Sequence, residues 1–347
     1  MKRLTLKPGE IHQISDIIFR ITLPQPFYAP NQVYLINDEM KMLIDSGYVE
    51  SLGSLALALR TLGLKMNDID ILLYTHPHID HITGGLLWSQ YARRTERWGH
   101  HTLMRDMPDF PDSIDTWQAD TARIFTIAFR DHKARMQRIS RAQARWARFA
   151  NRFTNNDNKQ GDRAIKLDRL LKENDQFSTG KLQFTILETP GHNKWHITPV
   201  ETTQGFVFTG DLLIGNIPAI YDNIDGNLED FQRSLRKLLA LRPQYPDMRF
   251  FPAHGEEITH PERAIKIVQK TLGIIENGIM KKLVEGRKGL LELIESAFGT
   301  KLENGNHFIT ALELMEALLR KLMREGKVRS EVYEGGYEEF WLVHQSD

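Results

Sequence analysis

The chain of 347 residues contains no cysteine, no long apolar run and no excess of charge of one sign. The absence of cysteine excludes disulfides, thiol nucleophiles and cysteine-ligated zinc. No apolar run approaches the roughly 20 residues of a membrane helix, and the first residues do not resemble a signal peptide. The 45 basic and 45 acidic residues indicate neither a nucleic-acid nor a membrane partner. We therefore expect a cytoplasmic protein of two units, not associated with membranes.

Potential metal ligands are concentrated in one short stretch, residues 75–81, which follows an apolar run at 69–74. Within six positions it contains His76, His78, Asp80 and His81. Imidazole nitrogens and carboxylate oxygens are ligands of zinc and of related metals such as iron and manganese. One histidine on a loop is usually an ordinary side chain, but a divalent cation would satisfy this whole cluster at once. The spacing differs from a helical His-x-x-x-His pair, so we expect the ligands on a loop.

Four other short apolar runs end in the same way, at a turn that contains glycine or proline. An aspartate or histidine stands at each of these turns: Asp45, His192, Asp211 and His254. Short apolar runs bounded by turn residues predict strands, and the carboxyl ends of strands in an α/β sheet converge on one edge. The sequence therefore predicts that residues far apart in the chain form one site.

The five motifs LIDSG, THPHIDH, TPGH, FTGD and PAHG occur in the order typical of the metallo-β-lactamase superfamily. The chain resembles this superfamily over about residues 14–88 and 180–260. The resemblance implies an α/β fold, the αβ/βα four-layer sandwich. It also implies a first metal on His76, His78 and His192, a second on Asp80, His81 and His254, and Asp211 as a bridge.

The remaining candidates receive supporting roles. Asp45 is expected outside the ligand shell, where it orients a ligand. Five further histidines are expected to be structural or ordinary: His100, His101, His132, His196 and His260.

The implied cofactors are two divalent metal ions, with zinc favoured and iron or manganese as alternatives. Two such ions would hold a bridging hydroxide as nucleophile. Asp80 and Asp211 are the expected catalytic residues, which position the hydroxide and accept its proton.

The substrate class follows less directly from the sequence. A true β-lactamase would usually require export, and the motif form is more similar to the glyoxalase-II and ribonuclease branches. We predict a dinuclear metal-dependent hydrolase acting on an anionic ester or thioester. The main alternative is a metal-dependent endoribonuclease acting on single-stranded RNA. A non-catalytic metal-binding regulatory protein and diiron redox chemistry are disfavoured, because the motifs are intact and no flavin module is present.

Residues 89–177 interrupt the predicted metallo-β-lactamase domain of residues 1–260. The segment is rich in Arg, Gln and Ala, which predicts a helical insertion. Basic residues recur every three or four positions along it, at Arg138, Arg141, Arg145 and Arg148. This stripe either binds an anionic substrate or forms the solvated face of a structural helix, and the second arrangement is the commoner one.

Residues 261–347 form the predicted second domain. Helices are expected at 262–284, 287–298 and 310–325, followed by a hairpin of 327–333 and 337–343. This order is similar to the winged-helix modules of endoribonuclease-like superfamily members. However, 13 basic and 14 acidic residues over 262–347 do not favour nucleic-acid binding. We expect a structural role, with homodimerisation as an alternative.

Overall fold

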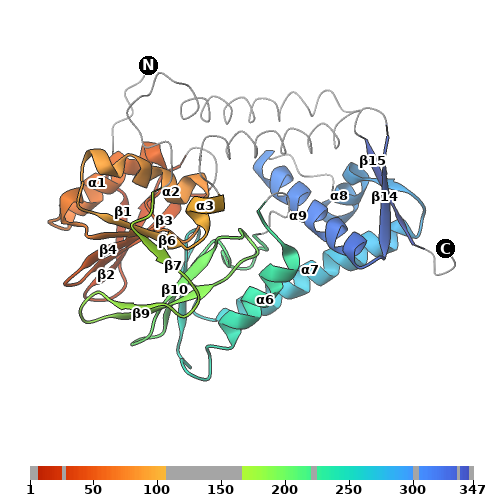
Figure 1. The fold of residues 1–347 in the computed structure, drawn as a ribbon. Coiled ribbons are helices and arrows are strands. Elements are labelled where there is room, and N and C mark those ends of the chain that lie inside the picture. The colour runs from red at the N-terminus through yellow and green to blue at the C-terminus, as the bar shows by residue number, and fades with distance from the viewer. Residues whose placement is uncertain are drawn as a thin grey trace, which may run out of the picture.

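Two β-sheets packed face to face form the centre of the fold (Figure 1). The computed structural model describes residues 7–25, 29–106, 166–219, 225–299, 305–333 and 337–343. The strands of the first sheet follow sequence order: β1 (Glu10–Gln13), β2 (Ile18–Leu23), β3 (Asn31–Asn37), β4 (Lys41–Ile44), β5 (Ile71–Leu73), β6 (Glu96–His100) and β7 (Arg169–Leu171). Neighbouring strands from β1 to β4 are antiparallel, and those from β4 to β7 are parallel.

The second sheet is largely antiparallel. Its order is β12 (Arg249–Pro252), β11 (Phe206–Gly210), β10 (Ile197–Glu201), β9 (Gln183–Glu188) and β8 (Gln176–Ser178). Only β11 and β12 pair in parallel. As a result, β11 and β12 end at the same edge of the sheet.

Alternate residues of the central strands face different apolar cores, as the two-residue period of a strand requires. Ile36 and Ile44 pack between the two sheets, whereas Leu35 and Leu43 face the helices α1 (Leu52–Thr61) and α2 (Ile79–Leu86). The outer face of the second sheet packs against α6 (Leu228–Leu239) and α7 (Pro261–Leu283). The predicted αβ/βα four-layer sandwich is confirmed. Short elements connect the layers: η1 (Val49–Ser51), η2 (Met66–Asp68), η3 (Trp88–Gln90) and α3 (Leu103–Asp106).

The predicted helical insertion over residues 89–177 was wrong at both ends. Residues 89–106 contain β6, and residues 166–177 contain β7 and the start of β8. These strands are three to five residues long and carry charged or polar side chains, so they lack the apolar runs by which strands are predicted. The arginine stripe Arg138, Arg141, Arg145 and Arg148 lies outside the described residues, as does His132.

The C-terminal elements gather at the far end of α7 (Figure 1). They are β13 (Lys288–Gly289), α8 (Leu290–Phe298), α9 (Gly305–Arg324), β14 (Val328–Val332) and β15 (Glu338–Leu342). The helix predicted from residue 287 begins only at Leu290, because Lys288 and Gly289 pair with β15. The winged-helix character and the boundary at residue 260 stay predictions. Within the described residues, no helix is long and apolar enough to cross a membrane.

Basic side chains at the end of α9 hold this region onto the rest of the protein. Arg324 donates to both carboxylate oxygens of Glu229 on α6, at 2.8 and 3.0 Å. Lys321, which is buried, lies 2.8 Å from Glu276 on α7. These cations are therefore already paired with acidic residues of neighbouring helices.

Helix α2 lies so close to the turn after β4 that only glycine fits at one position. A Cβ atom on Gly84 would lie 2.3 Å from the carbonyl oxygen of Ser46, whereas one on Gly273, in the exposed face of α7, would meet nothing within 4 Å. Gly84→Ala should therefore lower the free energy of unfolding by about 3 kcal/mol through overpacking. Gly273→Ala should raise it by about 0.5–1 kcal/mol, because alanine restricts the unfolded chain. Urea unfolding of both variants tests this, and equal effects would contradict it.

Candidate metal centre

The residues of the THPHIDH motif lie where β5 passes into α2. His76 follows the strand, His78 is the residue before the helix, and Asp80 and His81 occupy its first turn. The expectation that all four lie on a loop was therefore wrong for Asp80 and His81. A carboxylate in a first helical turn is favourable, because the backbone N–H groups there carry partial positive charge. Asp80 and His81 on this short helix therefore lie near the edge of the sheets where the other motif residues stand.

The first group of donors consists of three imidazole nitrogens, one each from His76, His78 and His192. Nε2 of His192 lies 3.2 Å from Nε2 of His76 and 2.9 Å from Nδ1 of His78, and the last two nitrogens are 3.1 Å apart. Neutral rings cannot satisfy three mutual contacts with the protons available to them. A tetrahedral ion with bonds of about 2.0–2.1 Å would hold its nitrogen ligands about 3.3 Å apart. The observed spacing fits such an ion.

The outer nitrogens of two of these rings are held in place. Nδ1 of His76 lies 3.0 Å from the hydroxyl of Thr75, and Nδ1 of His192 lies 2.9 Å from the carbonyl oxygen of Ala219. Burial, together with the neighbouring histidines, lowers the pKa of His76 and lowers that of His192 to about 4. Both rings are therefore neutral near pH 7, as metal ligands must be.

The second group of donors consists of Asp80, His81 and His254, so it contains a carboxylate as well as imidazoles. Nε2 of His254 lies 3.2 Å from Oδ2 of Asp80, and Nε2 of His81 lies 3.6 Å from Oδ1 of the same aspartate. Nδ1 of His81 contacts Asp45 at 2.8 Å, and Nδ1 of His254 lies 3.1 Å from the carbonyl oxygen of Pro30. As in the first group, the ring nitrogen that points away from the other donors therefore has a hydrogen-bond partner in both histidines.

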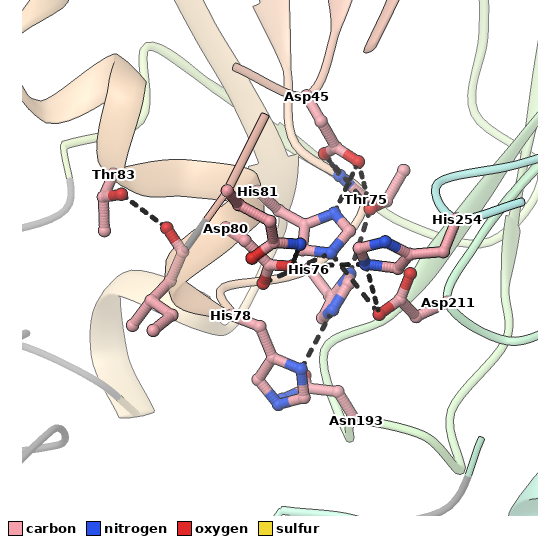
Figure 2. Close-up of polar contacts among 12 residues, drawn as sticks. Asp45, Thr75, His76, His78, Asp80, His81, Thr83, Asn193, Asp211 and His254 are labelled. Carbon is pink, nitrogen blue, oxygen red and sulfur yellow. Dashed lines mark hydrogen bonds and ion pairs between the residues drawn. The ribbon is translucent and has the colours of Figure 1, made fainter. Parts of the chain in front are cut away.

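Asp211 contacts donors of both groups, and Figure 2 shows it beside His254. Its Oδ2 is 3.4 Å from Nε2 of His81, 3.5 Å from that of His254 and 3.6 Å from that of His192. Within the described part of the chain, Oδ1 of Asp211 and Nε2 of His81 have no hydrogen-bond partner although both are buried. Buried polar atoms without partners are costly, and cations in the two groups would satisfy both.

Without cations, the carboxylates of the second group raise the pKa of the histidines beside them. Burial alone would lower the pKa of His254, but the carboxylates of Asp211 and Asp80 raise it to about 9. Burial would raise the pKa of Asp211, but His254 and His81 hold it well below its usual range. In the metal-free chain, protons on histidine thus balance the carboxylates that cations would otherwise balance.

Asp45 connects the two groups from outside. Its carboxylate accepts hydrogen bonds from the backbone N–H of Thr75 at 2.8 Å, from the hydroxyl of Thr75, and from Nδ1 of His81 at 2.8 Å. Since Thr75 contacts His76, one buried carboxylate supports a ligand of each group. The backbone of Asp45 has a φ of 61°, which aspartate and asparagine tolerate better than most residues.

Among the other described histidines, His196 lies beside the first group, with its ring centroid 5.2 Å from that of His76. His196 is buried, with Nδ1 2.8 Å from the hydroxyl of Thr189, and His260 immediately precedes α7. Nδ1 of His100 accepts the N–H of Thr102 at 3.2 Å, so Nε2 carries the proton and lies 3.7 Å from Glu188. His100, His101 and Glu188 form a further group of donors, in which His101 is exposed. None of the five motifs includes these residues, and we predict no metal there.

Several supporting residues were not predicted from the sequence. Gln25 donates to Oδ2 of Asp80 at 3.1 Å, and Thr75 and Asn193 directly flank predicted ligands. Their positions beside the motifs are a sequence signal that could have identified Thr75 and Asn193. No local pattern marks Gln25, which the fold brings from the end of β2.

Comparison of this chain with known proteins identifies its family. The family model described as "Metallo-beta-lactamase superfamily" matches residues 28–254, more than half of the chain. The chain belongs to the metallo-β-lactamase superfamily, as the motifs predicted, and it is a metallo-hydrolase of that superfamily. A Bacillus subtilis protein named "Probable metallo-hydrolase YqjP" is 28% identical over 270 residues, which cover 73% of this chain and 76% of that protein.

Two further relatives have narrower or more distant similarity. A hydroxyacylglutathione hydrolase of Idiomarina loihiensis is 31% identical over 127 residues, 36% of this chain and 45% of that enzyme. The crystal structure of a metallo-β-lactamase family protein from Thermus thermophilus superimposes with a TM-score of 0.67 at 17% identity, over 95% of this chain and all of that one. At this identity the structural similarity shows the fold alone.

Removing the charge of Asp45 should weaken metal binding in both groups. Asp45→Asn keeps the size and the tolerated backbone conformation, and we expect metal affinity to fall about 10- to 100-fold. Asp38→Asn is the control, because Asp38 is a buried carboxylate that accepts three hydrogen bonds at the opposite end of β4. Competition with a chelating dye measures both affinities. Equal affinity of Asp45→Asn and the wild type would contradict the role of Asp45.

His100 should make the free energy of unfolding depend on pH. Burial lowers its pKa to about 4, whereas the unfolded chain has the ordinary histidine pKa of about 6.5. Between these values the unfolded state binds a proton that the folded state does not, so stability should fall as the pH drops from 6.5 to 4. His100→Asn should flatten this dependence in urea unfolding series. Parallel pH profiles of variant and wild type would contradict the prediction.

Proposed function

We propose that the protein is a dinuclear metal-dependent hydrolase that cleaves an anionic thioester. The observation that carries the proposal is the arrangement of six donor residues in two groups, with Asp211 in contact with both. The first ion would be held by His76, His78 and His192, and the second by Asp80, His81 and His254. Zinc suits this set of imidazole and carboxylate donors, and iron or manganese would also fit it.

Two divalent cations held by these residues would supply an acidified water as nucleophile and a Lewis acid for the carbonyl group of the substrate. The chain itself contributes position and proton acceptance. Asp80 and Asp211 are buried carboxylates with low pKa values, so they are ionised near pH 7 and can orient the attacking water. Asp211, whose Oδ1 has no partner among the described residues, is the better placed to accept the water proton.

The substrate class is supported by the relatives. Several are named hydroxyacylglutathione hydrolase, at 31–32% identity over the matched segments. These segments cover less than half of each enzyme, so the thioester is part of the proposal. RNA receives less support, because basic side chains at the end of α9 pair with Glu229 and Glu276 instead of being available for phosphates.

Removal of one ligand should abolish both metal binding and turnover. His78→Ala deletes a partly exposed ligand, so the fold should tolerate it, and kcat should fall on the order of 10³-fold or more. His101→Ala is the matched control, because His101 is exposed and contacts Glu188 instead of the donors. Metal content and hydrolysis of a panel of thioesters, phosphodiesters and single-stranded RNA are measured for all three proteins.

The pattern of activity separates the alternatives. Thioester hydrolysis that requires His78 supports the proposal, and metal-dependent cleavage of RNA would replace it with an endoribonuclease. Two bound ions without turnover of any substrate would point to a regulatory metal-binding protein. Full activity of metal-free His78→Ala would contradict metal-dependent hydrolysis altogether.

A further inference from the structure

The turn before α6 fastens the loop that carries His192. The backbone N–H of Asn227 donates to the carbonyl oxygen of Gly191 at 2.7 Å, and the Asn227 side chain caps α6 by accepting the N–H of Asp230 at 2.9 Å. Gly191 has a φ of +141°, and a Cβ there would lie 2.2 Å from Cα of Phe231 on α6. The loop is therefore pressed against the start of the helix.

Asp225 belongs to the same turn and is buried, with 4% of its surface exposed. Its Oδ2 lies 3.4 Å from Nε2 of His78 and 2.6 Å from the amide nitrogen of Asn193. The orientation of the Asn193 amide is defined, because its oxygen accepts the backbone N–H of Trp195 at 2.9 Å. The amide nitrogen of Asn193 thus donates to Asp225 and fixes the carboxylate.

The two nitrogens of His78 face different surroundings. Nδ1 lies within 3.1 Å of the donor nitrogens of His76 and His192, whereas Nε2 lies 3.4 Å from the carboxylate of Asp225 and 3.4 Å from the amide nitrogen of Asn193. The shorter contact of that amide, at 2.6 Å, is its donation to Asp225. A neutral imidazole carries its proton on one nitrogen only. The carboxylate favours the proton on Nε2, which leaves the lone pair of Nδ1 directed at the first group of donors.

Charge also favours this arrangement. The first group contains three neutral histidines, whereas the second contains Asp80, and Asp211 contacts both. A negative charge near a dication that is held by three neutral ligands in a buried position is favourable. Asp225 places one behind His78.

We propose that Asp225, held by Asn193, is a positioning residue that sets the tautomer of His78 and tightens the first metal site. This inference rests on the proposed function, because it concerns the affinity of that site. Asp225 itself does not ligate, since its Oδ2 is turned to Nε2 of His78 and is occupied by the Asn193 amide. The turn at residues 225–227 thereby supports two of the three histidines of the first group.

The test titrates the full-length metal-free chain with zinc and with cobalt, whose absorption bands report the ligand geometry. Wild type should bind two ions. Asp225→Asn, which keeps shape and removes charge, should lose about 10- to 100-fold in affinity at one site only. The same substitution in a His254→Ala background, where the second site lacks a ligand, should weaken the remaining tight site. Asp38→Asn again serves as control and should bind both ions as wild type does.

A second variant separates charge from shape. Asp225→Glu restores a carboxylate, so it should recover most of the affinity and the cobalt bands that Asp225→Asn loses. If Asp225 only packs the turn, the order reverses, because asparagine fits its place and glutamate does not. That reversal, or two wild-type affinities in Asp225→Asn, would overturn the inference. Binding of fewer than two ions by the wild type would instead contradict the proposed dinuclear function.

Discussion

A buried imidazole can offer one nitrogen to a cation only when its other nitrogen has a partner, and the candidate metal centre depends on this constraint. Each of the five histidines in the two groups has such a partner: the Thr75 hydroxyl, the Asp225 carboxylate, the Asp45 carboxylate and the carbonyl oxygens of Ala219 and Pro30. These partners come from both sheets and from the turn before α6. The four-layer packing is therefore what makes five defined tautomers available at one place.

The two groups of donors differ in charge, and this difference shapes the metal-free state. The first group consists of neutral rings, because burial and mutual repulsion keep protons off them. The second group retains protons on His81 and His254, because the neighbouring carboxylates raise the pKa of both rings despite their burial. Loading the second group therefore releases protons, whereas loading the first mainly relieves repulsion between lone pairs.

Much of this arrangement could be predicted from the sequence, because most of the candidate ligands stand just after strands and the motifs mark those positions. The layer order, the superfamily and the meeting of His76, Asp211 and His254 all followed from such local patterns. Partners that the fold brings from elsewhere could not be predicted in this way. Gln25 and Asp225 have no motif of their own, and only the packing of β2 and α6 places them beside Asp80 and His78.

Sequence patterns failed where strands are short. β7 is the edge strand of the first sheet and β6 is its neighbour. Both contain charged residues, so their composition resembles that of the helical segment predicted around them. The two-residue strand β13 was hidden for the same reason within a predicted helix, and only its pairing with β15 defines it. Periodicity requires several repeats to be visible, and these elements are too short to show it.

One apolar cluster runs without interruption from Leu187 on β9, through α6 and α7, to Phe340 on β15. Layers that pack around one cluster lose that packing together, so the second sheet and the C-terminal helices should unfold as a single cooperative unit. The loop with His192 and the turn with Asp225 are both anchored on α6, within that unit. Heat that loosens the C-terminal helices would consequently loosen the support of His192 and His78 as well.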